Sequence, residues 1–218
     1  MSLERQESLL LAQQRRGYRR LRFTGVLEDE FLDHRVQRIR RRLLLIISTA
    51  VIFQLVYTAL DLVLLPLNAS LATLPMRLLG MCGALLAFFY CRRPHTPPRR
   101  VLLAYVAAYA LNGASVAVII HLCWSLGVAM PYDGLFLVLL FGYVLLGVSF
   151  RAVSLASWGV CGLFLWLGWV VTGGSVALGY QGLFLFCANL IGSVGAYLQE
   201  HGQRGAWLNL RLLDLARQ

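Results

Sequence analysis

An arginine-rich run stands directly before the first long apolar segment of the chain. Four of the five residues from Arg38 to Arg42 are arginine, and the segment from Leu43 to Leu65 carries no formal charge except that of Asp61. As a helix this segment would be about 34 Å long, enough to cross the hydrocarbon core of a bilayer. Because arginine enters lipid only at high cost and accumulates in cytoplasmic loops, the chain is predicted to begin in the cytoplasm.

The composition also indicates a protein embedded in a membrane. Of the 218 residues, 59% are hydrophobic and 14% are charged, which is more apolar surface than a soluble domain of this length can bury. The lipid bilayer is therefore the expected partner. The net charge of +10 comes from arginines that are not interleaved with aromatic residues. We interpret it as a topology signal and expect no nucleic-acid partner.

Successive apolar segments predict an all-α, polytopic membrane protein with six transmembrane helices. The expected spans are 43–66, 74–91, 101–123, 132–150, 153–172 and 180–199. The stretch from Tyr132 to Thr172 would be about 60 Å long as one helix, so it must turn, and Arg151 marks the turn. This alternation puts 19 of the 20 arginines on one side, which predicts that both termini are cytoplasmic.

The membrane region, 43–199, is expected to lie between two cytoplasmic segments, 1–42 and 200–218. Little before Leu27 fixes a fold. From Leu27 to Arg42, acidic residues precede basic ones, which suits the dipole of a helix. We expect a short amphipathic helix here, either along the inner membrane face or simply solvated.

The last apolar segment continues past the membrane surface as a helical exit. Leu208, Leu212 and Leu215 follow one another at spacings of four and three, as in the seam of a parallel coiled coil, which predicts a homodimer. Small residues flanking Gly192 at four-residue spacing fit either packing inside the bundle or a dimer interface. Because the helical pattern is still running at Gln218, we expect a further domain to follow.

No catalytic, cofactor or metal-binding motif is recognisable. The five cysteines form no CxxC pair, and the four histidines lie in separate segments. A phosphate loop, a nucleotide-binding GxGxxG, an HExxH and a nucleophile elbow are all missing from the sequence. We therefore expect no catalytic residue, no metal ligand and no cofactor in this chain.

Polar residues near the outer side of the membrane are the candidate site. Asp61 and Arg77 lie on either side of a short outer connection and are expected to form an ion pair. His121 and Asp133 are predicted at the same level, and Tyr57 shares a helix face with Asp61. One interpretation is that Asp61 and Arg77 hold the first helical hairpin together while the others meet water or each other. The alternative is a pocket that opens outward and binds a small periplasmic or membrane-borne ligand.

Polar residues nearer the middle of the membrane are expected to form hydrogen bonds between helices. Gln54, Asn112 and Asn189 are in this class. Asn112 and His121 are nine residues apart, on nearly opposite faces of a helix, so they cannot line one cavity. Asn189 and Tyr197 share one stripe of the sixth helix, and together with the three leucines of the exit they are the candidate signal-relay residues.

Several local features together resemble one family of bacterial membrane sensors. They are Leu27-Glu28-x-x-Phe31, the Arg-rich run, Asp61-x-x-x-x-Pro66, Arg77-Leu78, and a final helix leading through Glu200 and Arg204 to LLDLARQ. This pattern resembles the six-helix MASE-type modules that precede nucleotide cyclase domains, and LLDLARQ is similar to the linker before a GGDEF diguanylate cyclase domain. The resemblance implies an inner-membrane sensory and dimerisation module in bacteria. GTP and magnesium are expected only for the output domain, whose signature residues this chain lacks.

Other functions remain open at this point. The output domain could be an adenylate cyclase or a histidine kinase. A small membrane transporter is a further alternative, although the sequence lacks an inverted repeat and charges at the membrane midplane. The last alternative is a purely structural membrane anchor.

Overall fold

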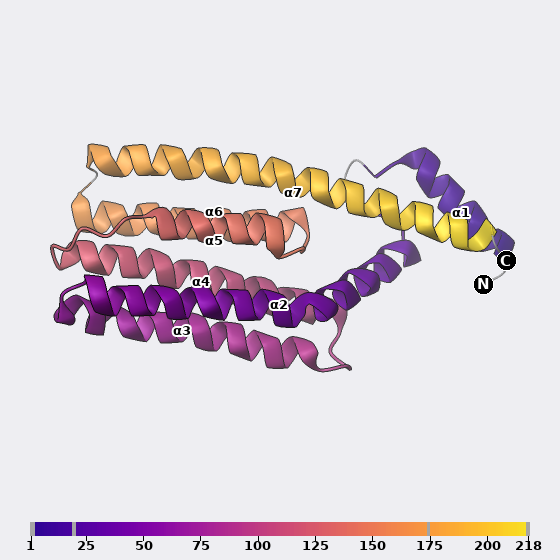
Figure 1. Cartoon of the computed structure of the whole chain (residues 1–218). Coiled ribbons are helices and arrows are strands. Elements are labelled where there is room, and N and C mark those ends of the chain that lie inside the picture. Colours follow the sequence, from indigo (N-terminus) through magenta and orange to yellow (C-terminus); the bar gives the residue numbers. More distant parts are fainter. Residues whose placement is uncertain (1–2, 19–20, 174, 217–218) are drawn as a thin grey trace.

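The computed structural model describes residues 3–18, 21–173 and 175–216, and these form an all-α structure (Figure 1). The helices are α1 (Leu3–Arg16), α2 (Val26–Leu64), α3 (Leu67–Arg92), α4 (Pro98–Ser125), α5 (Asp133–Leu145), α6 (Phe150–Thr172) and α7 (Val176–Ala216). Helices α2 to α7 run side by side as an elongated bundle, and α1 packs on the part of α7 that extends beyond it. Many large apolar side chains on the outside of the bundle are exposed, as expected for surfaces that face lipid.

Within the described ranges, five helices, rather than the expected six, are long and apolar enough to cross a membrane. The exception is α5, whose 13 residues give a length of about 20 Å, shorter than the hydrocarbon core of roughly 30 Å. Pro131 precedes this helix, and Gly147 follows it with a φ of 66° that leaves the helical region. The expected turn before Arg151 is nevertheless confirmed, since α5 ends at Leu145 and α6 begins at Phe150.

The segment from Leu27 to Arg42 is not a separate amphipathic helix. It forms the first part of α2, which continues into the membrane-spanning part without a break over 39 residues. No glycine or proline occurs between Leu27 and Leu65, so nothing in the sequence ends the helix at the membrane surface. The same region packs against α7, where it buries Leu27, Phe31 and Arg35.

Most arginines lie at the end of the bundle where α2 enters it and α7 leaves it, which we call the arginine-rich end; Arg77 lies toward the other end. The α3–α4 loop also lies here, because Arg40 of α2 donates hydrogen bonds to the carbonyl oxygens of Cys91 (3.1 Å) and Arg93 (2.8 Å). Cys91 lies in the last turn of α3 and Arg93 directly follows the helix, where carbonyl oxygens have no partner within the helix. One arginine thereby fixes the connection between α3 and α4.

Helix α7 is continuous over 41 residues and passes from the bundle into the exit, as expected. One face of it is buried along nearly its whole length; the members of this face are Leu185, Asn189, Ala196, Glu200, Arg204, Trp207 and Leu208. The spacing of three, four or seven residues keeps them on one side of the helix. The exit segment therefore packs on its own chain rather than projecting alone.

Helix α1 and the start of α2 cover the exit segment with an apolar cluster. Leu10, Phe23 and Phe31 pack against Trp207 and Leu208. The rings of Phe23 and Phe31 lie 5.4 and 5.7 Å from that of Trp207, which is within the range of stabilising aromatic pairs. The first 26 residues, for which the sequence predicted no fold, thus contribute a helix that holds α7.

Close packing between α5 and α7 depends on Gly192. The ring of Tyr143 on α5 lies across this glycine, so that a Cβ atom at residue 192 would overlap the ring. The Tyr143 hydroxyl donates a hydrogen bond of 2.8 Å to Asn189 Oδ1 and lies 3.1 Å from Ser193 Oγ. The small residue therefore serves packing inside the bundle, which was one of the two expected roles.

We predict that Gly192→Ala destabilises the bundle, because the methyl group displaces Tyr143 from its hydrogen bonds. The loss should be about 1–3 kcal/mol in the free energy of unfolding, measured by thermal unfolding in detergent. Gly195→Ala is the matched control, since a Cβ at residue 195 of the same helix meets no atom within 4 Å. It should leave stability unchanged or raise it by up to about 1 kcal/mol through helix propensity. Equal losses in both variants would contradict the packing role.

Candidate functional site

The first helical hairpin is closed by a buried ion pair. Arg77 Nε on α3 donates to Asp61 Oδ2 on α2 at 2.9 Å, and the two side chains are only 5% and 7% exposed. Ser70 Oγ adds a 2.8 Å hydrogen bond to the carbonyl oxygen of Asp61. The expected pairing of Asp61 with Arg77 is confirmed. In a dry environment each charge depends on the other, because an unpaired ion there is very costly.

Amide side chains extend this pair toward α4. Arg77 Nη1 donates to Gln54 Oε1 at 3.4 Å, and Gln54 Nε2 donates to Asn112 Oδ1. Gly80 permits the approach of α3, since a Cβ there would lie 2.8 Å from Gln54 Nε2. The expected hydrogen bonding between helices is thus present for Gln54 and Asn112, and it joins α2, α3 and α4.

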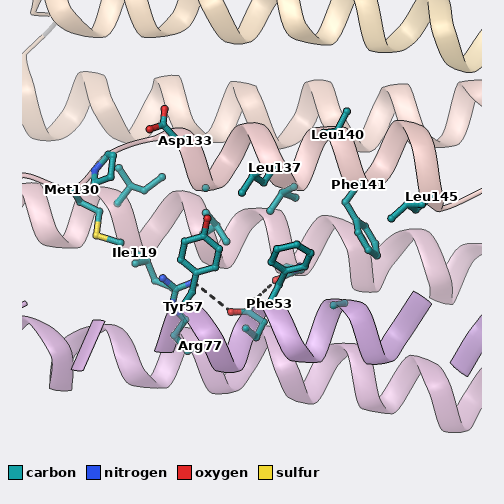
Figure 2. A pocket seen from close by; sticks show the side chains of 18 of the residues that line it. Phe53, Tyr57, Arg77, Ile119, Met130, Asp133, Leu137, Leu140, Phe141 and Leu145 are labelled. Carbon is teal, nitrogen blue, oxygen red and sulfur yellow. Dashed lines mark hydrogen bonds between the residues drawn. The ribbon is translucent and has the colours of Figure 1, made fainter. Parts of the chain in front are cut away.

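A cavity of about 490 Å³ lies beside this network, between α2, α4 and α5. We call it the lateral groove. Helix α4 contacts both α2 and α5, whereas α2 and α5 scarcely meet, so the groove is floored by α4 and bordered by the other two. Figure 2 shows the side chains that α2 and α5 direct into it. Its volume is within the range of roughly 300–1,000 Å³ that is usual for small-molecule sites.

The groove is polar at one end and apolar along most of its length. Gln54, Tyr57, Arg77 and Asn112 provide the polar end. The guanidinium of Arg77 lies 5.4 Å from the centre of the Tyr57 ring, and the Tyr57 hydroxyl points across the groove toward α5 (Figure 2). The apolar part is lined by Phe53, Val116, Ile119, Leu137, Phe141 and Val144.

The structure distributes the five predicted ligand-binding residues over three places. Tyr57, Arg77 and Asp133 line the groove, although the carboxylate of Asp133 is exposed and points away from Arg77 (Figure 2). Asp61 lies behind Arg77 and does not line the groove. His121 lies elsewhere and does not line it either.

The ring of His121 packs on the α6 side of α4. Its Nδ1 lies 2.8 Å from the carbonyl oxygen of Ala117, and its ring centre is 4.7 Å from that of Phe164. Within the described part of the chain, Nε2 is buried and has no hydrogen-bond partner. Because Asn112 lines the groove and His121 does not, the expectation that they cannot share a cavity is confirmed.

A second polar site lies at the arginine-rich end, where α7 leaves the bundle. It consists of Glu28, Arg35, Glu200 and Arg204, which we call the exit charge cluster. Arg204 donates two hydrogen bonds to Glu28, of 2.7 and 2.9 Å, and lies 3.1 Å from Glu200. Arg35 donates to Glu200 at 2.7 Å. The two acids and two bases balance in charge, so each buried ion has a partner of opposite sign.

The exit charge cluster also reaches α6. Glu200 Oε2 accepts a hydrogen bond of 2.6 Å from the backbone N–H of Phe150, the first residue of α6. A carboxylate is favoured at this position, because the N-terminus of a helix carries partial positive charge. The guanidinium of Arg204 lies 4.4 Å from the centre of the Phe31 ring. Helices α2, α6 and α7 are thus joined at one point.

Sequence reasoning missed this cluster as a unit. Its acids and arginines are separated by 165 and 176 residues in the two long-range pairs, so no local spacing could connect them. The available signal was Glu200. A carboxylate in a helix that is apolar before it and basic after it requires a partner of opposite charge.

The predicted signal-relay residues lie along the buried side of α7. Asn189 bonds to Tyr143, and the ring of Tyr197 lies 5.8 Å from that of Phe150 at the start of α6. Leu208 is only 1% exposed, and Leu212 and Leu215 pack against the same cluster. These leucines therefore contact α1 and α2 of their own chain.

No protein-family model and no curated protein matches the chain. What the chain does must therefore be inferred from its geometry. Within the described residues, the histidines, cysteines and acids form no group of three or more that could hold a metal ion.

We predict that Asp61→Ala lowers the free energy of unfolding by about 3–5 kcal/mol, because it leaves the buried charge of Arg77 unpaired. Thermal unfolding in detergent measures the effect. The double variant Asp61→Leu with Arg77→Met should recover most of the loss, since it removes both charges and keeps the volume. Asp133→Ala, at an exposed acid, should stay within about 0.5 kcal/mol of the parent. If the double variant is no more stable than Asp61→Ala, the pair is not what holds the hairpin.

Proposed function

We propose that the chain is a sensory and dimerisation module of the bacterial inner membrane that regulates a C-terminal diguanylate cyclase. The observation that carries this proposal is the continuous helix α7, which passes through the bundle and is held by the exit charge cluster where it leaves. In this proposal both termini are cytoplasmic, the signal is a small periplasmic or membrane-borne ligand, and GTP and magnesium bind only the output domain.

The exit charge cluster suits a coupling element. A rotation or shift of α7 cannot occur alone, because Glu200 and Arg204 would leave their partners on α2 and α6. Either the three helices move together or the buried pairs exchange partners. The cluster also has unused hydrogen-bond donors, since Nε and Nη1 of Arg35 are buried without a hydrogen-bond partner among the described residues. A second arrangement of the same charges would use these two N–H groups, and two discrete arrangements are what a switch requires.

Dimerisation of the exit helix has a suitable surface on the side away from α1 and α2. Ala206, Leu210 and Leu213 are exposed there and follow one another at spacings of four and three. This spacing suits a coiled-coil seam between two copies and leaves Leu208 in place. Two cyclase domains have to meet for the condensation of two GTP molecules, so the angle at which paired exit helices leave the membrane would set activity.

The test is a fusion of residues 1–218 to a GGDEF domain that is active only as a dimer, with cyclic di-GMP as the readout. Glu200→Gln should change output by about threefold or more in either direction, corresponding to about 0.7 kcal/mol, because it weakens the pairs with Arg35 and Arg204. The matched control is Asp214→Asn, which alters an exposed acid on the same helix and should leave output unchanged.

A one-residue insertion after Gln203 should also change output, because it rotates the following helix by about 100°. Protein levels in the membrane fraction are measured for every variant. Output that ignores both Glu200→Gln and the insertion would overturn the proposal and leave an anchor or a transporter. Coupling to a histidine kinase or an adenylate cyclase domain, but not to a GGDEF domain, would retain the sensor and replace its output.

A further inference from the structure

The lateral groove has the features of a binding site that is entered from the bilayer. We infer that it binds one neutral amphiphile, with a carbonyl or hydroxyl headgroup at Arg77 and Tyr57 and a hydrocarbon tail along α5. Binding itself is independent of the function proposed above; only its role as the sensed signal rests on that function.

The rim of the groove is exposed on the outside of the bundle. Phe53 on α2 is 48% exposed, and Val144 on α5 is 54% exposed. Both side chains line the groove, together with the half-exposed Leu137 and Leu140. Because α2 and α5 scarcely contact each other, none of the described helices closes the groove on this side. A hydrocarbon chain can therefore enter from the membrane without passing through water.

The polar end of the groove has hydrogen-bond donors to spare. Of the five N–H groups of Arg77, one is donated to Asp61 and one to Gln54 among the described residues. The Tyr57 hydroxyl, which points across the groove, makes no hydrogen bond within the same part of the chain. Polar groups without partners are costly at membrane depth. A ligand oxygen placed between Arg77 and Tyr57 would satisfy them.

The charge of the site favours a neutral headgroup. Arg77 is already neutralised by Asp61 at 2.9 Å. An anionic headgroup would add an unbalanced negative charge in a medium of low dielectric constant, and a cationic one would lie against the guanidinium of Arg77. A carbonyl or hydroxyl oxygen gains the hydrogen bonds without either penalty.

The apolar part has the dimensions of one acyl chain. From Asp133 to Leu145 the wall formed by α5 is about 18 Å long at the helical rise per residue. Leu137, Phe141 and Val144 lie along it and line the groove at spacings of four and three. The cavity of about 490 Å³ suits a single ligand.

The experiment is photolabelling of the full chain in lipid nanodiscs with a monolaurin analogue that carries a diazirine in its acyl chain. Labelled peptides should come from the apolar part of the groove on α2 and α5, around Phe53 and Phe141. Unlabelled monolaurin should compete better than laurate or dodecyltrimethylammonium, which have the same tail but carry a negative and a positive charge. Tyr57→Phe should weaken monolaurin competition by about two- to tenfold through the loss of one hydrogen bond.

Leu137→Trp is the blocking variant, because it fills the groove from a half-exposed position, and it should abolish the site-specific labelling. Leu86→Trp is the matched control, since Leu86 is 70% exposed on α3 and does not line the groove. Equal labelling of both variants would show a bulk lipid annulus only and overturn the inference. Stronger competition by laurate would overturn the neutral headgroup, and cross-links between two copies in place of the label would show that a second chain fills the groove.

The same variants separate this inference from the proposed function. If Leu137→Trp blocks labelling while monolaurin does not change the cyclic di-GMP output of the fusion, the binding site is supported. The role of this site in sensing is then contradicted. If output depends on Glu200 but no site-specific labelling occurs, the sensory module stands and the amphiphile site is wrong.

Discussion

The pairing of buried charges determines how the helices of this protein are joined. Among the described residues, two places combine charge with near-complete burial: the Asp61–Arg77 pair and the exit charge cluster. In each, an arginine on one helix is held by acids on another, and removal of one partner would leave an ion that neither lipid nor protein solvates. Apolar packing alone specifies helix contacts weakly in a membrane, where lipid is as good a neighbour as leucine. The charge pairs therefore specify which helices meet and in which register.

The two places lie toward opposite ends of the bundle and share α2. Asp61 belongs to the last turn of this helix, while Glu28 and Arg35 belong to its first turns. The lateral groove borders the middle and last part of α2, next to Arg77. A ligand that displaces α2 at the groove would therefore act on the same rigid helix that positions the partners of α7. This gives the sensory proposal a continuous physical connection between a site and an output helix.

Sequence reasoning succeeded where the physics is local. The apolar segments, the turn before Arg151 and the pairing of Asp61 with Arg77 all follow from the lengths and spacings of neighbouring segments of the chain. It failed for the length of α5. The run is apolar throughout, so its composition does not show that the helix is confined between Pro131 and Gly147. It also failed for the exit charge cluster, whose partners are distant in sequence and meet only once the bundle has formed. The groove could not be predicted from the sequence either, since it depends on α2 and α5 packing on α4 with scarcely any contact between them.

The length of α7 has a mechanical consequence. An uninterrupted helix of 41 residues is about 60 Å long, and it bends little when one face is packed along most of that length. It therefore acts as a lever whose fulcrum is the point where Glu200 meets α6. A tilt of about 1° about this point moves the end of the exit helix, which lies 16 residues or about 24 Å further on, by about 0.4 Å. A displacement at the bundle end of α7 would thus reach the end of the exit helix in the opposite direction and at about two thirds of its size.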